Sequence, residues 1–173
     1  MKALRDYEIP MLIGGQMKNL ESIVGSEGMN FDGIDQSLFL LGLLSAFDNR
    51  YQAKADSFFE DMSWKQFFAI ICINLCKEPP TIKVLADIMG SSHQNVKQIL
   101  IKLEKKGYVQ ILQDDADKRK QRIILTEKTK TFCEEHEEGS QRIVGKIFEG
   151  IDPKDIGITI NTIMQMEKNL EEI

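Results

Sequence analysis

Several features that would define other classes of protein are missing from this sequence. The longest apolar runs, LFLLGLLSAF and FFAIICINL, reach about half of the roughly 20 residues that a membrane-spanning helix needs. Near the N-terminus, Asp6, Glu8 and Pro10 interrupt the apolar residues, which is unlike a signal peptide. We therefore expect a protein of the cytoplasm that has no membrane partner.

Catalytic motifs are missing as well. The sequence contains no glycine-rich phosphate loop, no G-x-S-x-G motif, and no array of Cys or His at metal-ligand spacing. His136, within EEHEE, could join carboxylates around a divalent ion. With two histidines in the chain, a solvated helix face is the simpler interpretation. We therefore expect no enzyme activity, no metal site and no cofactor.

Cysteine is scarce, and its three occurrences are Cys72, Cys76 and Cys133. An odd number in a chain without a secretory signal argues against a disulfide framework. Cys72 and Cys76 lie among apolar neighbours, as small buried hydrophobes do. A peroxide-sensing thiol needs a lowered pKa and solvent access, whereas Glu134 and Glu135 should raise the pKa of Cys133. We expect no redox sensitivity.

The strongest pattern in the chain lies between residues 81 and 126. Thr81 follows two prolines and can cap a helix, Gly90 can end that helix, and Ser92 can open a second one. Apolar residues recur at the helical period in both helices and predict a shared core: Ile82, Leu85, Ala86, Met89, Val96, Ile99, Leu100 and Leu103. Two short helices around a tight turn predict a helix-turn-helix.

The opposite face of the second helix is polar. Gln and Asn side chains can pair with adenine, and Lys can reach guanine or phosphate, so this face could read a major groove. On an isolated helix it would be interpreted as solvated surface, but the flanking segments favour DNA. The residues predicted to contact DNA from this helix are Ser92, His93, Gln94, Asn95, Lys97, Gln98 and Lys102.

After Gly107 the pattern changes from helix to two β-prone runs, which flank a connection too charged to bury. A basic loop on such a hairpin can lie on phosphates or enter a minor groove, where arginine is favoured. Asp117 is placed to hold the Arg119 guanidinium through charge-assisted hydrogen bonds. The residues predicted to contact DNA from this loop are Asp117, Lys118, Arg119 and Lys120.

The segment DKRKQRIILT, with LADIMGSSHQNVKQILIKLEKKGYV before it, closely resembles the MarR family of bacterial and archaeal transcription regulators. The wing signature of that family is an Asp, any residue, an Arg, five residues, and then Leu-Thr. Asp117, Arg119, Leu125 and Thr126 match it in register. Thr129 is a departure, because the family often has a glycine there, and it affects local helix geometry.

The net charge of −5 is unevenly distributed along the chain. Residues 81–126 hold nine Lys and Arg against five acids, whereas residues 1–80 hold seven against eleven and residues 127–173 hold six against eleven. A basic lobe on an acidic body presents that lobe to a polyanion.

The remaining segments predict helices on both sides of this lobe. One is expected from about Ile34 to Phe59, and a capping box at Ser63 begins another. Thr126 can cap a long helix, and Asp152 with Pro153 can begin the last one. The apolar stripes of the outer helices are too wide for a small monomer to bury. In the MarR family such helices intertwine into a dimer, and the resemblance implies the same here.

The predicted fold is therefore mainly α (α+β), a winged helix-turn-helix lobe with dimerisation helices at both ends. Its parts are an N-terminal extension over 1–30, an N-terminal dimerisation helix in 31–62, the DNA-binding domain over 63–126 and C-terminal dimerisation helices over 127–173. The length of 173 residues and 42% hydrophobic content suit one such domain with a helical extension.

The predicted function is that of a homodimeric transcription regulator, a repressor that responds to a small ligand and binds a pseudopalindromic operator in double-stranded DNA. The alternative is a winged-helix module for protein contact, which would have no need for the Asp117 and Arg119 pair. Relatives often bind small aromatic acids, although aromatic residues at helical spacing are more often core. The residues that could line such a pocket are Phe39, Phe47, Trp64, Phe67, Phe68 and Cys72.

Overall fold

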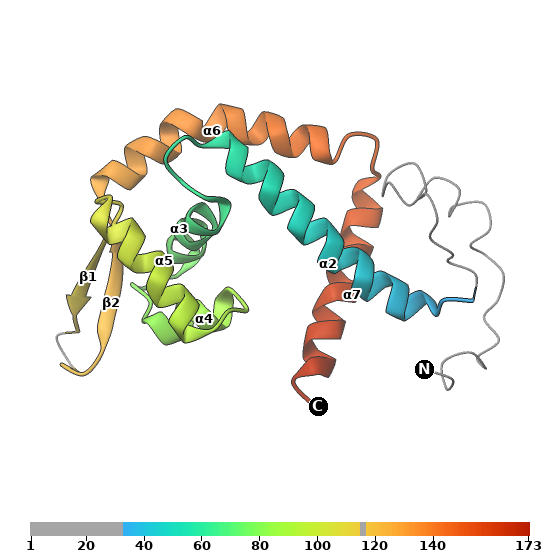
Figure 1. Ribbon diagram of the computed structural model, residues 1–173, viewed down its shortest axis with the longest axis horizontal. Coiled ribbons are helices and arrows are strands. Elements are labelled where there is room, and N and C mark those ends of the chain that lie inside the picture. The colour runs from blue at the N-terminus through green and yellow to red at the C-terminus, as the bar shows by residue number, and fades with distance from the viewer. Residues whose placement is uncertain (1–32, 115–116) are drawn as a thin grey trace. The chain divides into compact units, whose positions relative to one another are not determined.

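The computed structural model describes residues 33–114 and 117–173, and the chain divides into two compact units, Met1–Phe67 and Phe68–Ile173 (Figure 1). The predicted N-terminal extension over residues 1–30 lies outside the described residues. The elements in chain order are α2 (Gln36–Ala55), the 3-10 helix η1 (Asp56–Phe58), α3 (Trp64–Leu75), α4 (Ile82–Ile88), α5 (His93–Lys105), β1 (Val109–Gln113), β2 (Gln121–Leu125), α6 (Glu127–Ile147) and α7 (Pro153–Leu170).

The first unit contains the helix that was expected from Ile34 to Phe59. It begins after Asp35, whose Oδ1 accepts hydrogen bonds from the N–H groups of Ser37 at 2.9 Å and Leu38 at 3.1 Å. It runs as α2 to Ala55 and ends in the turn of η1. Leu38 and Leu41, in its apolar stripe, are each 52% exposed in the single chain.

The predicted capping box at the start of α3 is confirmed. The Ser63 N–H donates to Gln66 Oε1 at 3.2 Å, and the Gln66 N–H donates to Ser63 Oγ at 3.3 Å. This reciprocal pair satisfies two backbone donors that a helix end leaves free. Farther along the helix, the buried residues are Ala69, Ile70, Cys72 and Ile73.

The helix-turn-helix of α4 and α5 forms as its caps and its glycine predict. Thr81 Oγ1 accepts from the Val84 N–H at 3.3 Å, and Ser92 Oγ accepts from the Asn95 N–H at 3.2 Å. Gly90 has a φ of +57°, in the left-handed region that favours glycine. The predicted core is confirmed, with Met89 half-buried and the other residues buried: Ile82, Leu85, Ala86, Val96, Ile99, Leu100 and Leu103.

The wing is an antiparallel hairpin of β1 and β2, paired from Val109 with Leu125 to Gln113 with Gln121. Because side chains alternate along a strand, Val109 and Ile123 turn into the core while Leu112 remains exposed. The Ile123 N–H also donates to the carbonyl of Pro80 at 3.0 Å. This bond joins β2 to the segment that leads into α4.

Thr126 is the N-cap residue of α6 as predicted, but its hydroxyl makes no cap hydrogen bond to that helix. The hydroxyl donates instead to the carbonyl of Gly107 at 2.8 Å and approaches that of Tyr108 at 3.2 Å. One turn later the Thr129 hydroxyl also donates to the Tyr108 carbonyl. Lys128 Nζ donates to the carbonyl of Lys106 at 2.8 Å. These bonds fix the start of α6 to the turn between α5 and β1.

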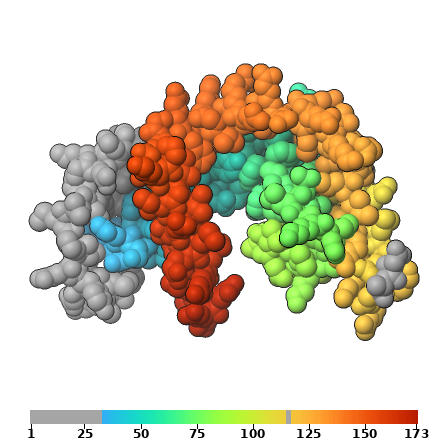
Figure 2. Space-filling view, turned by 180° about the vertical axis from the view of Figure 1, so that it is seen from behind, coloured from blue at the N-terminus to red at the C-terminus, as the bar shows by residue number. Residues whose placement is uncertain are grey.

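The last helix, α7, begins as predicted. Asp152 Oδ1 accepts from the Lys154 N–H at 2.8 Å, and Pro153 occupies the first turn. Many of its apolar residues are exposed, including Ile158, Ile160, Met164 and Leu170. Figure 2 shows the C-terminal segment in red. Within the described part of the chain, no helix is long and apolar enough to cross a membrane.

Candidate nucleic-acid interface

The outer face of α5 presents the polar residues that the sequence singled out. Ser92 precedes this helix, and its hydroxyl oxygen accepts the hydrogen bond of the helix cap. Asn95 is exposed, and its Nδ2 donates to Ser91 Oγ at 2.8 Å. This bond uses one of the two amide protons and leaves the carbonyl oxygen for another partner. The other predicted residues on this face are all exposed: His93, Gln94, Lys97, Gln98 and Lys102.

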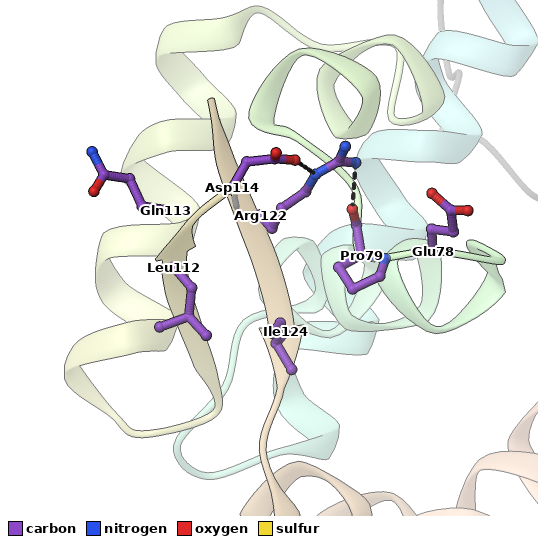
Figure 3. A pocket seen from close by; sticks show the side chains of 7 residues that line it. All are labelled: Glu78, Pro79, Leu112, Gln113, Asp114, Arg122 and Ile124. Atoms are coloured by element: carbon purple, nitrogen blue, oxygen red, sulfur yellow. Dashed lines mark hydrogen bonds and ion pairs between the residues drawn. The ribbon is translucent and has the colours of Figure 1, made fainter. Parts of the chain in front are cut away.

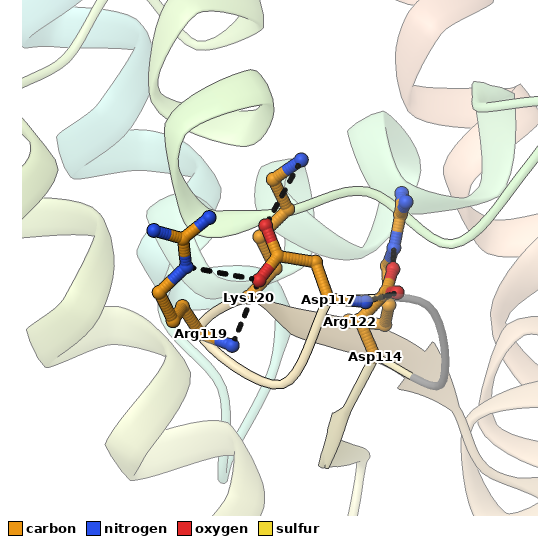
Figure 4. A network of polar contacts seen from close by, with 5 residues as sticks. All are labelled: Asp114, Asp117, Arg119, Lys120 and Arg122. Carbon is orange, nitrogen blue, oxygen red and sulfur yellow. Dashed lines mark hydrogen bonds and ion pairs between the residues drawn. The ribbon is translucent and has the colours of Figure 1, made fainter.

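The wing loop holds Arg119 and exposes it at the same time (Figure 4). Asp117 Oδ1 accepts from Arg119 Nε at 3.2 Å and from the Arg119 N–H at 3.1 Å. Lys120 Nζ lies 3.6 Å from the other carboxylate oxygen. The Arg119 side chain is nevertheless 91% exposed. The predicted contact between Asp117 and Arg119 is confirmed, and it leaves the terminal nitrogens of the guanidinium available to an anion.

The charge of Asp117 is stabilised by the same contact. The hydrogen bond from the Arg119 side chain, and then that from its backbone N–H, lower the pKa of Asp117 below its usual value. Lys120 acts in the same direction. The carboxylate is therefore ionised at neutral pH, and it is paired with both Arg119 and Lys120.

A buried carboxylate behind this loop was not predicted. Asp114 is 8% exposed, and its Oδ2 accepts from Arg122 Nε at 2.5 Å. Arg122 Nη1 donates to the carbonyl of Pro79 at 3.0 Å (Figure 3). The register of β1 and β2 could have suggested the pair, because Arg122 is paired with Leu112 and Asp114 is then its diagonal neighbour toward the loop end of the hairpin.

Three of the residues predicted to line a ligand pocket lie in one aromatic cluster of the first unit. Phe47 stacks on Tyr51 with ring centroids 6.0 Å apart, and Tyr51 meets the edge of Trp64 at 4.8 Å. Phe67 lies 6.1 Å from Trp64. The sequence did not single out Tyr51, whose pKa is raised by burial.

The other three predicted pocket residues lie on α2 and α3. Phe39 lies on α2, and Phe68 and Cys72 lie on α3, where Phe39 and Phe68 are half-buried and Cys72 is buried. The contacts of the cluster are those of packed rings, so a ligand pocket at these residues stays a prediction.

The thiols and His136 have surroundings that differ from those of a sensor or a metal site. Burial raises the pKa of Cys72, and Cys76 adds to that effect. The pKa of Cys133 is raised as predicted, although burial is the larger cause and Glu134 the smaller. His136 is not on a fully solvated face, because its ring stacks on Phe132 at 4.2 Å. No group of three or more His, Cys, Asp or Glu among the described residues could hold a metal ion.

Two helices with an exposed polar outer face, followed by a hairpin with a basic loop, define a winged helix-turn-helix protein. Residues 62–120 match the model of the MarR family.

Solved structures have the same fold over most of the chain. A MarR/EmrR family transcriptional regulator from Acinetobacter sp. ADP1 is 15% identical, with a TM-score of 0.71 over 81% of this chain and 100% of that one. FabT from Streptococcus pneumoniae, solved in complex with DNA, is 22% identical with a TM-score of 0.57, over 80% and 99%. BpsR from Bordetella bronchiseptica is 17% identical with a TM-score of 0.64, over 74% and 98%. The family and these structures are of transcription regulators, in agreement with the expectation that the chain is no enzyme.

Proposed function

We propose that this protein is a transcription regulator that binds a pseudopalindromic operator as a homodimer. The observation that carries the proposal is the wing, where Asp117 holds an arginine that is 91% exposed. An exposed ion pair contributes little to folding, so its arrangement suits a contact with an outside partner. The excess of basic residues over 81–126 makes that partner a polyanion.

The polar face of α5 and the wing would then divide the work of recognition. The face of α5 supplies amide and ammonium groups, of the kind that pair with base edges in the major groove. Lys118, Arg119 and Lys120 would lie on phosphates or in the adjacent minor groove. The DNA complex of FabT, which has this fold, supports DNA as the partner.

Homodimer formation is proposed from the exposed apolar surface of α2 and α7. Leu38 and Leu41 on α2, and Ile160 and Met164 on α7, are more than half exposed in the single chain. Burying one Leu or Ile side chain contributes roughly 1.5 to 3 kcal/mol. Twofold pairing through residues 31–62 and 127–173 would bury such side chains twice, because a symmetric interface uses each surface on both subunits.

The proposed regulator is a repressor, and the proposed effector that changes its affinity for DNA is a small aromatic acid. The regulation of DNA binding by 6-hydroxynicotinic acid in BpsR supports this class of ligand. Phe47, Trp64 and Phe67 supply aromatic rings against which such a molecule could stack. The cytoplasm remains the expected location.

The proposed function is tested by selecting preferred sequences from a random duplex library and measuring affinity over a series of salt concentrations. An inverted repeat should emerge, with affinity falling steeply as salt rises, because phosphate contacts release counterions. A variant that combines Gln94→Ala and Arg119→Ala is the matched control. A protein-contact module would instead show weak binding with no preferred sequence. Thermal shift against a panel of aromatic acids then tests the effector.

A further inference from the structure

The wing loop is anchored through the buried carboxylate of Asp114. Its Oδ1 accepts a hydrogen bond at 2.9 Å from the N–H of Asp117, which lies in the loop (Figure 4). Its Oδ2 accepts from Arg122 Nε on the returning strand. The Asp114 N–H also donates to the carbonyl of Lys120 at 3.0 Å. Asp114 therefore bonds two residues of the loop that carries Arg119, on either side of it, and one residue of β2.

Arg122 continues this connection into the helix-turn-helix. Its Nη1 donates to the carbonyl of Pro79 (Figure 3). The neighbouring Ile123 N–H donates to the carbonyl of Pro80. Thr81, which caps α4, is the next residue along the chain. The hydrogen bonds thus run without a break from the Asp117 backbone through Asp114 and Arg122 to the start of α4.

From this geometry we propose that Asp114 and Arg122 are positioning residues for DNA binding. They hold the wing loop in one orientation relative to α4 and α5, so that Arg119 reaches DNA while α5 is in its groove. The inference rests on the proposed function. A loop held in its binding geometry before contact loses less conformational entropy when it binds, and a buried, paired carboxylate specifies that geometry because leaving it unpaired is costly.

Arg122 itself is poorly placed to contact DNA. Its side chain is 36% exposed, against 91% for Arg119, and both Nε and Nη1 are already engaged. A planar guanidinium can span two acceptors in this way, whereas a lysine ammonium on a flexible stem cannot reproduce both bonds. Arg122 therefore acts on DNA through the position of Arg119.

The test is a double-mutant cycle in operator binding with Asp114→Asn, Arg119→Ala and the combined variant. Arg119→Ala should weaken binding by about 5- to 150-fold, and Asp114→Asn by about tenfold. If Asp114 acts by positioning Arg119, Asp114→Asn should cost less than about twofold in the Arg119→Ala background. If the fold-losses in affinity of the two single variants multiply in the combined variant, Asp114 acts independently of Arg119, and the proposal is overturned.

Two further variants separate positioning from a general effect on charge or folding. Arg122→Lys keeps the charge and should lose about as much affinity as Asp114→Asn. Glu78→Gln removes an exposed carboxylate from the same surface hollow and should bind like the wild type. Equal losses in Glu78→Gln and Asp114→Asn would show that the effect does not depend on the contacts of Asp114, and would refute the proposal.

Hydrogen exchange distinguishes failure of this inference from failure of the proposed function. A wild-type protein without any preferred DNA sequence would refute the proposed function alone. The anchoring is read independently from the amide protons of Asp117 and Ile123, which should exchange on the order of tenfold faster in Asp114→Asn. Those of Leu100 and Leu103, in the core of α5, should keep their rates. Unchanged exchange at Asp117 would show that Asp114 does not hold the loop.

Discussion

At the scale of single residues, the wing shows how one side chain can be fixed and exposed together. Arg119 Nε is engaged by Asp117, while the rest of its guanidinium faces solvent. Because the pKa of Asp117 is lowered, the pair is complete above the usual pKa of an aspartate. It is lost as the pH falls through the lowered value, so operator binding near neutral pH should not vary through this pair.

Replacing Arg119 by alanine should cost on the order of 1 to 3 kcal/mol of operator binding and reduce the salt slope by about one phosphate contact. Asp117→Ala should be milder, since Asp117 orients the arginine without carrying the positive charge. Fluorescence anisotropy at several salt concentrations measures both quantities. Lys54→Ala, which removes an exposed lysine of α2, is the control. Wild-type affinity in Arg119→Ala would exclude the wing from DNA binding.

The cysteines should be unreactive under mild oxidation. Burial raises the pKa values of Cys72 and Cys133, so both remain thiols at neutral pH, and the thiolate is the reactive form. We expect moderate peroxide to leave DNA binding intact, and iodoacetamide to label the folded protein slowly by mass spectrometry. A variant with all three cysteines replaced by serine or alanine should still bind operator. A loss of binding that a thiol reductant reverses would contradict this expectation.

At the scale of elements, the first turns of α5 should determine sequence preference. Gln94→Ala should relax the preferred sequence at one position of each half-site, at about 1 to 3 kcal/mol of discrimination. Asn95→Ala should act in the same direction but less strongly, because Asn95 already donates to Ser91. Lys97→Ala should instead weaken binding to all sequences about equally. Selection experiments that return the wild-type motif for Gln94→Ala and Asn95→Ala would show that another face is read.

The start of α6 should be stabilised by the Thr129 hydroxyl. Thr129 is 1% exposed, so Thr129→Val, which keeps the shape and removes the hydroxyl, should lower the free energy of unfolding by about 1 kcal/mol. Thr131→Val is the matched control, because its exposed hydroxyl bonds the carbonyl of Glu127 within the same helix. Urea denaturation followed by circular dichroism measures the difference. Equal stability of the two variants would show that the bond to Tyr108 contributes nothing.

The contacts of Thr129 and Asp114 could not be predicted from the sequence, whereas the local helix caps could. Helix caps at Thr81 and Ser92 and the turn at Gly90 depend on neighbours within four residues, so local chemistry predicted them. The hydroxyls of Thr126 and Thr129 bond carbonyls about twenty residues away, and Asp114 meets Arg122 across a hairpin. These hydrogen-bond partners depend on tertiary packing and strand register, and a local sequence pattern carries no information on either.

At the scale of the whole molecule, removing the chain after Asp152 should leave a monomer. Light scattering of the intact chain at micromolar concentration should give twice the 19.8 kDa of one copy. Without α7 the variant should bind DNA weakly and without cooperation between half-sites, because the recognition helices lose their fixed spacing. In the dimer that spacing is about one helical turn of DNA, roughly 34 Å, or a small multiple. A monomeric intact chain would refute both the dimer and the inverted repeat.

The start of α6 is held by hydrogen bonds to the segment that joins α5 to β1. Three successive carbonyls just after α5, those of Lys106, Gly107 and Tyr108, each accept a hydrogen bond from a side chain at or just before the first turn of α6. Because these three acceptors are held, a displacement of the start of α6 would be passed to the segment that follows α5. In the proposed DNA complex, a partner or effector that turned α6 would therefore not need to approach DNA to change the position of α5.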